Sequence, residues 1–284
     1  MAKSSLPLKT FRIQLQIAET NEIFSLPRCQ NDLTLKQLKS DLELLTGIPF
    51  HFQRLHYLDE IDLLDDSTFM DNDIVPRGTI TMRIWRQDGW GQLVAAAAEG
   101  DTMKLAQLGV TKEYAGTSPY AKILGPKQKK EWVAHRAFVA LFVASHRGHV
   151  NAVKFLLSHG ANVHSKTPLG RTALHVAAVM GRCECIELLV SCGARALDPD
   201  CEGQTAMGTE AGERDCCGQS HPGSPQNCIL TFEVRFQYLY HVLPFCSLAA
   251  ESKIKYAHVY RDKHVLHMFS QILTLGTLNR LSLI

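Results

Sequence analysis

Cysteine and histidine are the residues of this chain best suited to bind a metal, and four of them gather near its end. Thiolates and imidazoles are the usual ligands of structural zinc, and the stretch holds Cys216, Cys217, His221 and Cys228. Adjacent cysteines cannot easily point at one ion, and the chain has no paired Cys-x-x-Cys motif. We therefore predict reduced thiols and no metal or other cofactor, with a zinc-dependent enzyme as an alternative.

Catalytic groups of other kinds are not evident in the sequence. It shows no nucleophile–base pair, acid pair or glycine-rich phosphate loop. The basic run at residues 127–130 could bind phosphate or direct localisation, but a short lysine run is more often a solvated surface. We therefore expect that the chain is not an enzyme.

The composition indicates an ordinary globular protein, long enough for about two domains. Of its 284 residues 45% are hydrophobic and 20% charged, and the formal net charge of +2 gives no strong field to attract nucleic acid. The first residues lack the apolar core of a signal peptide, and no apolar run reaches the length of a membrane span. We expect an intracellular protein, cytoplasmic or nuclear, with its cysteines reduced.

One pattern occurs twice in the middle of the chain at a constant spacing. The run Leu141–Gly148 is followed 33 residues later by Leu174–Gly181, and the Gly-Ala pair at residues 160–161 by that at 193–194. A period of about 33 residues with a Thr-x-Leu-His-x-Ala opening, here Thr172–Ala177, is the pattern of ankyrin repeats, which this region resembles. The resemblance implies pairs of helices that stack into an array.

The repeat region extends over residues 88–207. Its expected units are residues 88–109, 137–168, 169–200 and a truncated opening at 200–207. The first two units are separated by more than one period, which places an insertion at residues 111–130. Because that stretch holds Gly116, Pro119, Gly125 and Pro126, we expect a loop.

Ankyrin arrays bind proteins through their turn tips and inner helix faces, so the resemblance implies a protein partner of unknown identity. We assign partner binding to exposed positions on the tip between units and at the end of a first helix: Lys166, Leu169, Arg171, Val179 and Met180. The resemblance gives His175 and His149 structural roles instead, with His175 tying the turn to its helix.

The N-terminal region predicts a second fold over residues 10–86. Alternating apolar residues at 10–17 and a short run at 23–26 predict a hairpin, the leucines of residues 35–45 a helix, and residues 54–58 and 79–85 two more strands. The ordered motifs Thr34–Lys39, Thr46–Pro49, Gln53–Leu58 and Gly78–Ile84 resemble the ubiquitin-like fold.

Departures from ubiquitin restrict the expected function. The last strand continues into the repeats instead of ending in a free Gly-Gly tail, so we do not expect conjugation to other proteins. The positions of ubiquitin's apolar receptor patch carry His56 and Arg83, which we expect to be solvated surface residues. Burying such polar groups against an apolar receptor would carry a desolvation penalty.

The tail, residues 208–284, predicts irregular structure with one amphipathic helix at 263–275. This helix could bind a partner or a membrane surface, but we favour a poorly packed segment or a cap on the repeats. The whole chain is thus expected to be an α+β protein: a ubiquitin-like β-grasp domain, a short ankyrin stack and an irregular tail. We expect a non-enzymatic protein-interaction module or scaffold. The alternative is an adaptor in a ubiquitin or proteasome pathway.

Overall fold

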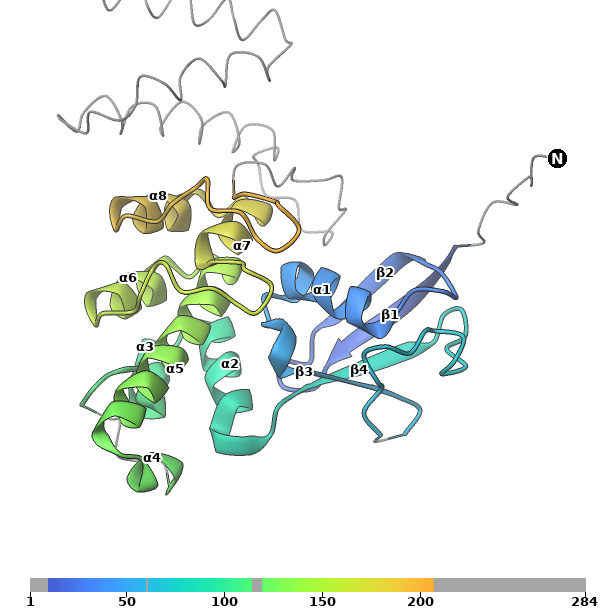
Figure 1. The fold of residues 1–284 in the computed structure, drawn as a ribbon, viewed down its shortest axis with the longest axis horizontal. Helices are drawn as coiled ribbons and strands as arrows, with labels where there is room; N and C mark the ends of the chain where they lie inside the picture. Colours follow the sequence, from blue (N-terminus) through green and yellow to red (C-terminus); the bar gives the residue numbers. More distant parts are fainter. Residues whose placement is uncertain (1–9, 60, 114–118, 207–284) are drawn as a thin grey trace, which may run out of the picture. The chain divides into compact units, whose positions relative to one another are not determined.

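The computed structural model describes residues 10–59, 61–113 and 119–206 (Figure 1). The predicted tail at 208–284, its helix at 263–275 and the candidate zinc ligands lie outside the described residues.

The N-terminal part is a four-stranded sheet with one helix packed on it. The strands are β1 (Phe11–Ile17), β2 (Ile23–Cys29), β3 (Gln53–Tyr57) and β4 (Thr79–Ile84), in the order β2-β1-β4-β3. The first and last strands pair in parallel in the centre, and both outer pairs are antiparallel. Alternate residues of β1 are buried, as the period of the sequence predicts.

Helix α1 (Leu35–Thr46) follows the first hairpin, and its leucines complete the core of the sheet. It begins where the Thr34 side chain accepts a hydrogen bond from the amide of Gln37 at 3.2 Å. It ends at Gly47, whose φ of 70° lies in the left-handed region that favours glycine. A short turn of helix, η1 (Phe50–Phe52), then leads into β3.

The second part is a stack of helices, separated from β4 by five residues that include the turn η2 (Gln87–Gly89). Its elements are α2 (Trp90–Glu99), α3 (Thr102–Leu105) with the wide turn η3 (Ala106–Val110), α4 (Pro119–Ile123), α5 (Pro126–Arg147), α6 (Val150–Ser158), α7 (Ala173–Val179) and α8 (Cys183–Ser191). Helix α5 packs between α2 and α7, and α6 packs against α8.

Small residues let the inner helices approach one another closely. Ala96 and Ala97 of α2, Ala140 and Ala144 of α5, and Ala177 of α7 are all buried. Larger side chains on the outer helices, such as Leu156 and Leu189, fill the space between the layers. Figure 1 shows α2, α5 and α7 on the side of the stack that faces the sheet domain.

The insertion differs from the loop that its glycines and prolines predict. Residues 119–123 form α4, and α5 already begins at Pro126, so the lysine run at 127–130 lies in the first turns of a helix of 22 residues. Proline is favourable at the first helical position, because its missing amide hydrogen has no acceptor there. Trp132 of α5 and Ala121 of α4 are buried together, with Leu124 and Val133 packed against them.

Candidate functional site: the junction of the sheet domain and the repeats

Four of the five residues assigned to partner binding lie at the surface. Lys166 is exposed, and Leu169, Val179 and Met180 are partly exposed. Lys166 also contacts the next turn, since its Nζ lies 3.3 Å from the carbonyl oxygen of Pro199 and 3.7 Å from Asp198. The structure therefore leaves these positions available to a partner but does not test whether one binds them.

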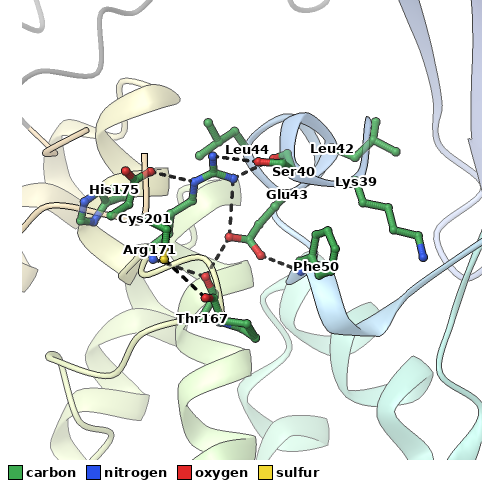
Figure 2. A network of polar contacts seen from close by, with 12 residues as sticks. Lys39, Ser40, Leu42, Glu43, Leu44, Phe50, Thr167, Arg171, His175 and Cys201 are labelled. Atoms are coloured by element: carbon green, nitrogen blue, oxygen red, sulfur yellow. Dashed lines mark hydrogen bonds and ion pairs between the residues drawn. The ribbon is translucent and has the colours of Figure 1, made fainter. Parts of the chain in front are cut away.

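The fifth residue, Arg171, is not exposed, and this corrects the expectation from the sequence. Only 2% of its side chain is accessible, because helix α1 of the sheet domain covers it. Its Nη1 donates to the carbonyl oxygen of Ser40 at 2.7 Å, and its Nε donates to Asp200 at 3.2 Å. Glu202 lies 3.4 Å from Nη2. Figure 2 shows the guanidinium held between the repeat turn and α1.

Glu43 of α1 is the acidic partner on the other side of this junction, and it is fully buried. Its Oε1 accepts from the hydroxyl of Thr167 at 2.9 Å and lies 3.7 Å from Arg171, while its Oε2 accepts from the amide of Phe50 at 2.6 Å (Figure 2). Burial raises the pKa of Glu43, and the hydrogen bonds from Phe50 and Thr167 together with Arg171 oppose that rise. Burial of the Glu43 carboxylate thus carries a desolvation penalty, which these hydrogen-bond donors and the Arg171 charge offset in part.

A second contact joins the end of α5 to the end of α1. Arg147 donates two hydrogen bonds to the carboxylate of Glu22, at 2.6 and 2.7 Å, and a third to the carbonyl oxygen of Thr46 at 3.2 Å. His146 is fully buried, with Nε2 3.0 Å from the carbonyl oxygen of Leu44. Burial lowers the pKa of His146 to about 3, so the ring is neutral at physiological pH.

A third contact is aromatic. The ring of Phe52, from the sheet domain, lies 4.5 Å from that of Trp90 and 5.9 Å from that of His135. His51 stacks on His135 at 5.7 Å, and burial followed by the charge repulsion of His135 lowers the pKa of His51 to about 4. Burial, followed by the charge of Arg136, also lowers the pKa of His135, so both histidines favour the neutral form in the folded protein.

The chain that connects the two parts is itself held in place. Arg136 of α5 donates to the carbonyl oxygen of Asp88 at 2.8 Å, and its guanidinium lies over the rings of Trp90 and Trp132. The indole of Trp132 donates to the Asp88 carboxylate at 2.5 Å. Burial lowers the pKa of Arg136 to about 10, yet it remains charged at neutral pH beside Asp88.

Together these contacts occupy the surface that an ankyrin array normally offers to partners. They involve the turn before α7, through Thr167 and Arg171, and the inner helix α5, through His135, His146 and Arg147. In this chain the N-terminal domain thus covers part of the inner repeat surface.

Two further histidines behave as the ankyrin resemblance implies. Nδ1 of His175 accepts a hydrogen bond from the amide of Thr172 at 3.1 Å and lies 2.9 Å from its hydroxyl. His149 places Nε2 2.6 Å from the carbonyl oxygen of Ala98 and so links two units.

The two polar residues at the expected receptor surface of the sheet domain differ from each other. The sequence predicts His56 at the surface, but His56 is only 8% exposed, and its Nε2 lies 3.2 Å from Asp62. Arg83 is partly exposed.

Within residues 10–59, 61–113 and 119–206, no three histidine, cysteine or acidic side chains are grouped so that they could hold a metal ion. In the same part of the chain, no helix combines the length and the apolar character needed to cross a bilayer.

Comparison with known proteins agrees with both parts of the fold. The chain matches the family described as "Ankyrin repeats (3 copies)" over residues 93–202 and the "Ubiquitin-like domain" family over residues 12–73. It is also similar to the "Protein fem-1 homolog A-like" of Mus musculus, with 37% identity over 76 residues. That alignment covers 26% of this chain but only 12% of the mouse protein. The chain therefore carries an N-terminal ubiquitin-like domain followed by ankyrin repeats.

Proposed function

We propose that the chain is a non-enzymatic protein-binding module in which the ubiquitin-like domain and the repeats act as one unit. Ankyrin repeats and ubiquitin-like domains are typically non-catalytic, and ankyrin repeats serve protein binding. The observation that carries the proposal is the burial of Arg171 against α1, with Ser40, Asp200, Glu202 and Glu43 around its guanidinium. A free repeat array would expose this side chain to a partner.

The partner surface that we propose is what the ubiquitin-like domain leaves accessible on the last complete unit. It comprises Lys166 and Leu169 on the turn and Val179 and Met180 at the end of α7. These positions combine one positive charge with three partly exposed apolar side chains. Such a mixture of an apolar centre and a polar rim is common at protein–protein interfaces.

Affinity purification with the full chain tests this assignment. We expect Leu169→Ala combined with Met180→Ala to lose a partner that the wild-type protein retains. The matched control is Ile123→Ala with Met103→Ala, which removes exposed apolar side chains elsewhere in the helical stack. If every partner is retained by both double variants, or lost from both, the assigned surface is wrong.

A second candidate function is an adaptor in a ubiquitin or proteasome pathway, supported by the ubiquitin-like match over residues 12–73. The polar surface of the sheet opposes it, since Arg54 stacks over Trp85 and His56 pairs with Asp62 where an apolar receptor would dock. An NMR titration with a proteasomal ubiquitin receptor distinguishes the two candidates. Absence of chemical-shift changes along β3 would exclude the adaptor function.

We also propose that the ubiquitin-like domain is not conjugated to other proteins, because β4 leads into η2 and α2.

A further inference from the structure

The first part of the connection from β3 to β4, residues 58–64, carries three strongly exposed apolar side chains. Leu58 is 92% exposed, Ile61 70% and Leu64 74%. Single exposed apolar residues are common on proteins, but several together usually mark an interaction surface. None of the three contributes to the core of the sheet domain, so packing does not explain their apolar character.

Backbone contacts hold several of the residues that the structure describes in this connection. Leu58 has a φ of 61°, a left-handed conformation that is unfavourable for a residue other than glycine. The amide of Asp59 donates to the carbonyl oxygen of Tyr57 at 2.8 Å, and the amide of Leu63 to that of Leu55 at 2.8 Å. Further along, Asp65 pairs with Lys39 of α1. A surface fixed in this way loses little conformational entropy when a partner binds.

The charges beside the three apolar side chains are negative. Asp59 and Asp66 are exposed, and the side chain of Asp62 is 52% exposed even though it pairs with His56. The one cation that lies near these carboxylates among the described contacts, Arg54, is 4.0 Å from Asp62, so negative charge is in excess. Such a surface repels phosphate groups, and therefore nucleic acid and anionic lipid. It is complementary to a partner that combines apolar side chains with lysine or arginine.

We propose that Leu58, Ile61 and Leu64 form a docking surface for the apolar face of a basic amphipathic helix on a partner protein. This surface lies on the ubiquitin-like domain, apart from the repeat positions of the proposed function, so either assignment can fail without the other. The helix contributes leucine-like side chains against the three residues, and its flanking basic residues face Asp59 and Asp66.

The test uses the full chain and a fluorescently labelled peptide of about 18 leucines and lysines, with leucine at i, i+3, i+4 and i+7. Fluorescence anisotropy gives its dissociation constant. We expect the triple variant Leu58→Ser, Ile61→Ser, Leu64→Ser to bind about tenfold more weakly or worse. The control Met103→Ser, Tyr120→Ser, Ile123→Ser removes three other exposed apolar side chains and should change the constant less than about twofold.

Charge is tested separately. Asp59→Asn with Asp66→Asn should weaken the leucine–lysine peptide, and the same peptide with glutamate for lysine should bind the wild-type chain poorly. Equal weakening by the two triple variants would overturn the proposal, as would an unchanged constant for the Leu58 triple variant. Equal affinity for the two peptides would overturn the charge assignment.

Discussion

Replacement of Arg171 by alanine should destabilise the protein far more than replacement of its partner Glu43 by glutamine. The Arg171 side chain is 2% exposed and faces three carboxylates, of Glu43, Asp200 and Glu202. Removal of this cation leaves the buried carboxylates of Glu43 and Asp200 uncompensated, at a cost of roughly 3–5 kcal/mol. Replacement of Glu43 leaves Arg171 paired with Asp200 at 3.2 Å.

The raised pKa of Glu43 shows that burial of its negative charge is unfavourable. Glutamine removes that charge and can still accept from the amide of Phe50 at the position of Oε2. We therefore expect Glu43→Gln to cost less than about 1 kcal/mol. In the Arg171→Ala background, the same change should recover about 1 kcal/mol, because one uncompensated carboxylate is gone.

The assay is urea and thermal unfolding of the full chain, followed by circular dichroism. A loss of roughly 3–5 kcal/mol lowers the melting temperature by roughly 6–20 °C for a domain of this size. Arg195→Ala is the control, because Arg195 is exposed on the same unit and should leave the melting temperature nearly unchanged. Equal melting temperatures for Arg171→Ala and Arg195→Ala, or a loss of stability by Glu43→Gln as large as that by Arg171→Ala, would contradict this prediction.

Three other changes test the junction and the exposed connection. Burial lowers the pKa of His51 to about 4 and that of His146 to about 3, whereas a histidine in the unfolded chain has a pKa of about 6.5. Below about pH 6.5 the unfolded chain therefore binds more protons than the folded protein, and the free energy of unfolding should fall as the pH is lowered toward 4. His51→Gln should make this pH dependence shallower in urea titrations. Gly47→Ala places a methyl group 2.5 Å from the His146 ring and should lower the urea midpoint clearly more than Gly160→Ala, whose equally left-handed position has free space. Leu58→Gly should raise the melting temperature slightly, by relief of its left-handed φ, and a clear drop would show that Leu58 packs.

The elements that depend on local sequence could be predicted. The leucines of α1, the alternation of β1 and the 33-residue period each depend on how one short segment buries its own apolar face. Strand β1 and helix α1 lie at nearly the expected bounds, and α7 and α8 lie within the unit expected at residues 169–200. The helix start within the insertion could also have been predicted from the sequence. Pro126 followed by lysine and glutamine, which are good helix formers, resembles a helix start as much as a loop.

The junction could not be predicted in this way. The ankyrin period places Arg171 on a turn tip, which is exposed unless another body covers it, and nothing near it in sequence identifies Ser40 as its acceptor. The burial of His56 could not be predicted for a similar reason, since its partner Asp62 lies in the irregular connection after β3. Both pairs are tertiary contacts between segments whose sequences indicate only an ordinary helix or turn.

The order in which the two halves of the junction are made has a consequence for biosynthesis. Arg171 follows Glu43 by 128 residues, so at about 5–20 residues per second it is synthesised roughly 6–25 s later. The ubiquitin-like domain can complete its sheet within that interval, while Glu43 is still hydrated. The repeat segments that then emerge meet a finished surface, first at Trp90 and His135, later at Arg147 and last at Arg171 on the turn before α7. The first domain is thereby placed to act as a template on which a short repeat array folds in chain order.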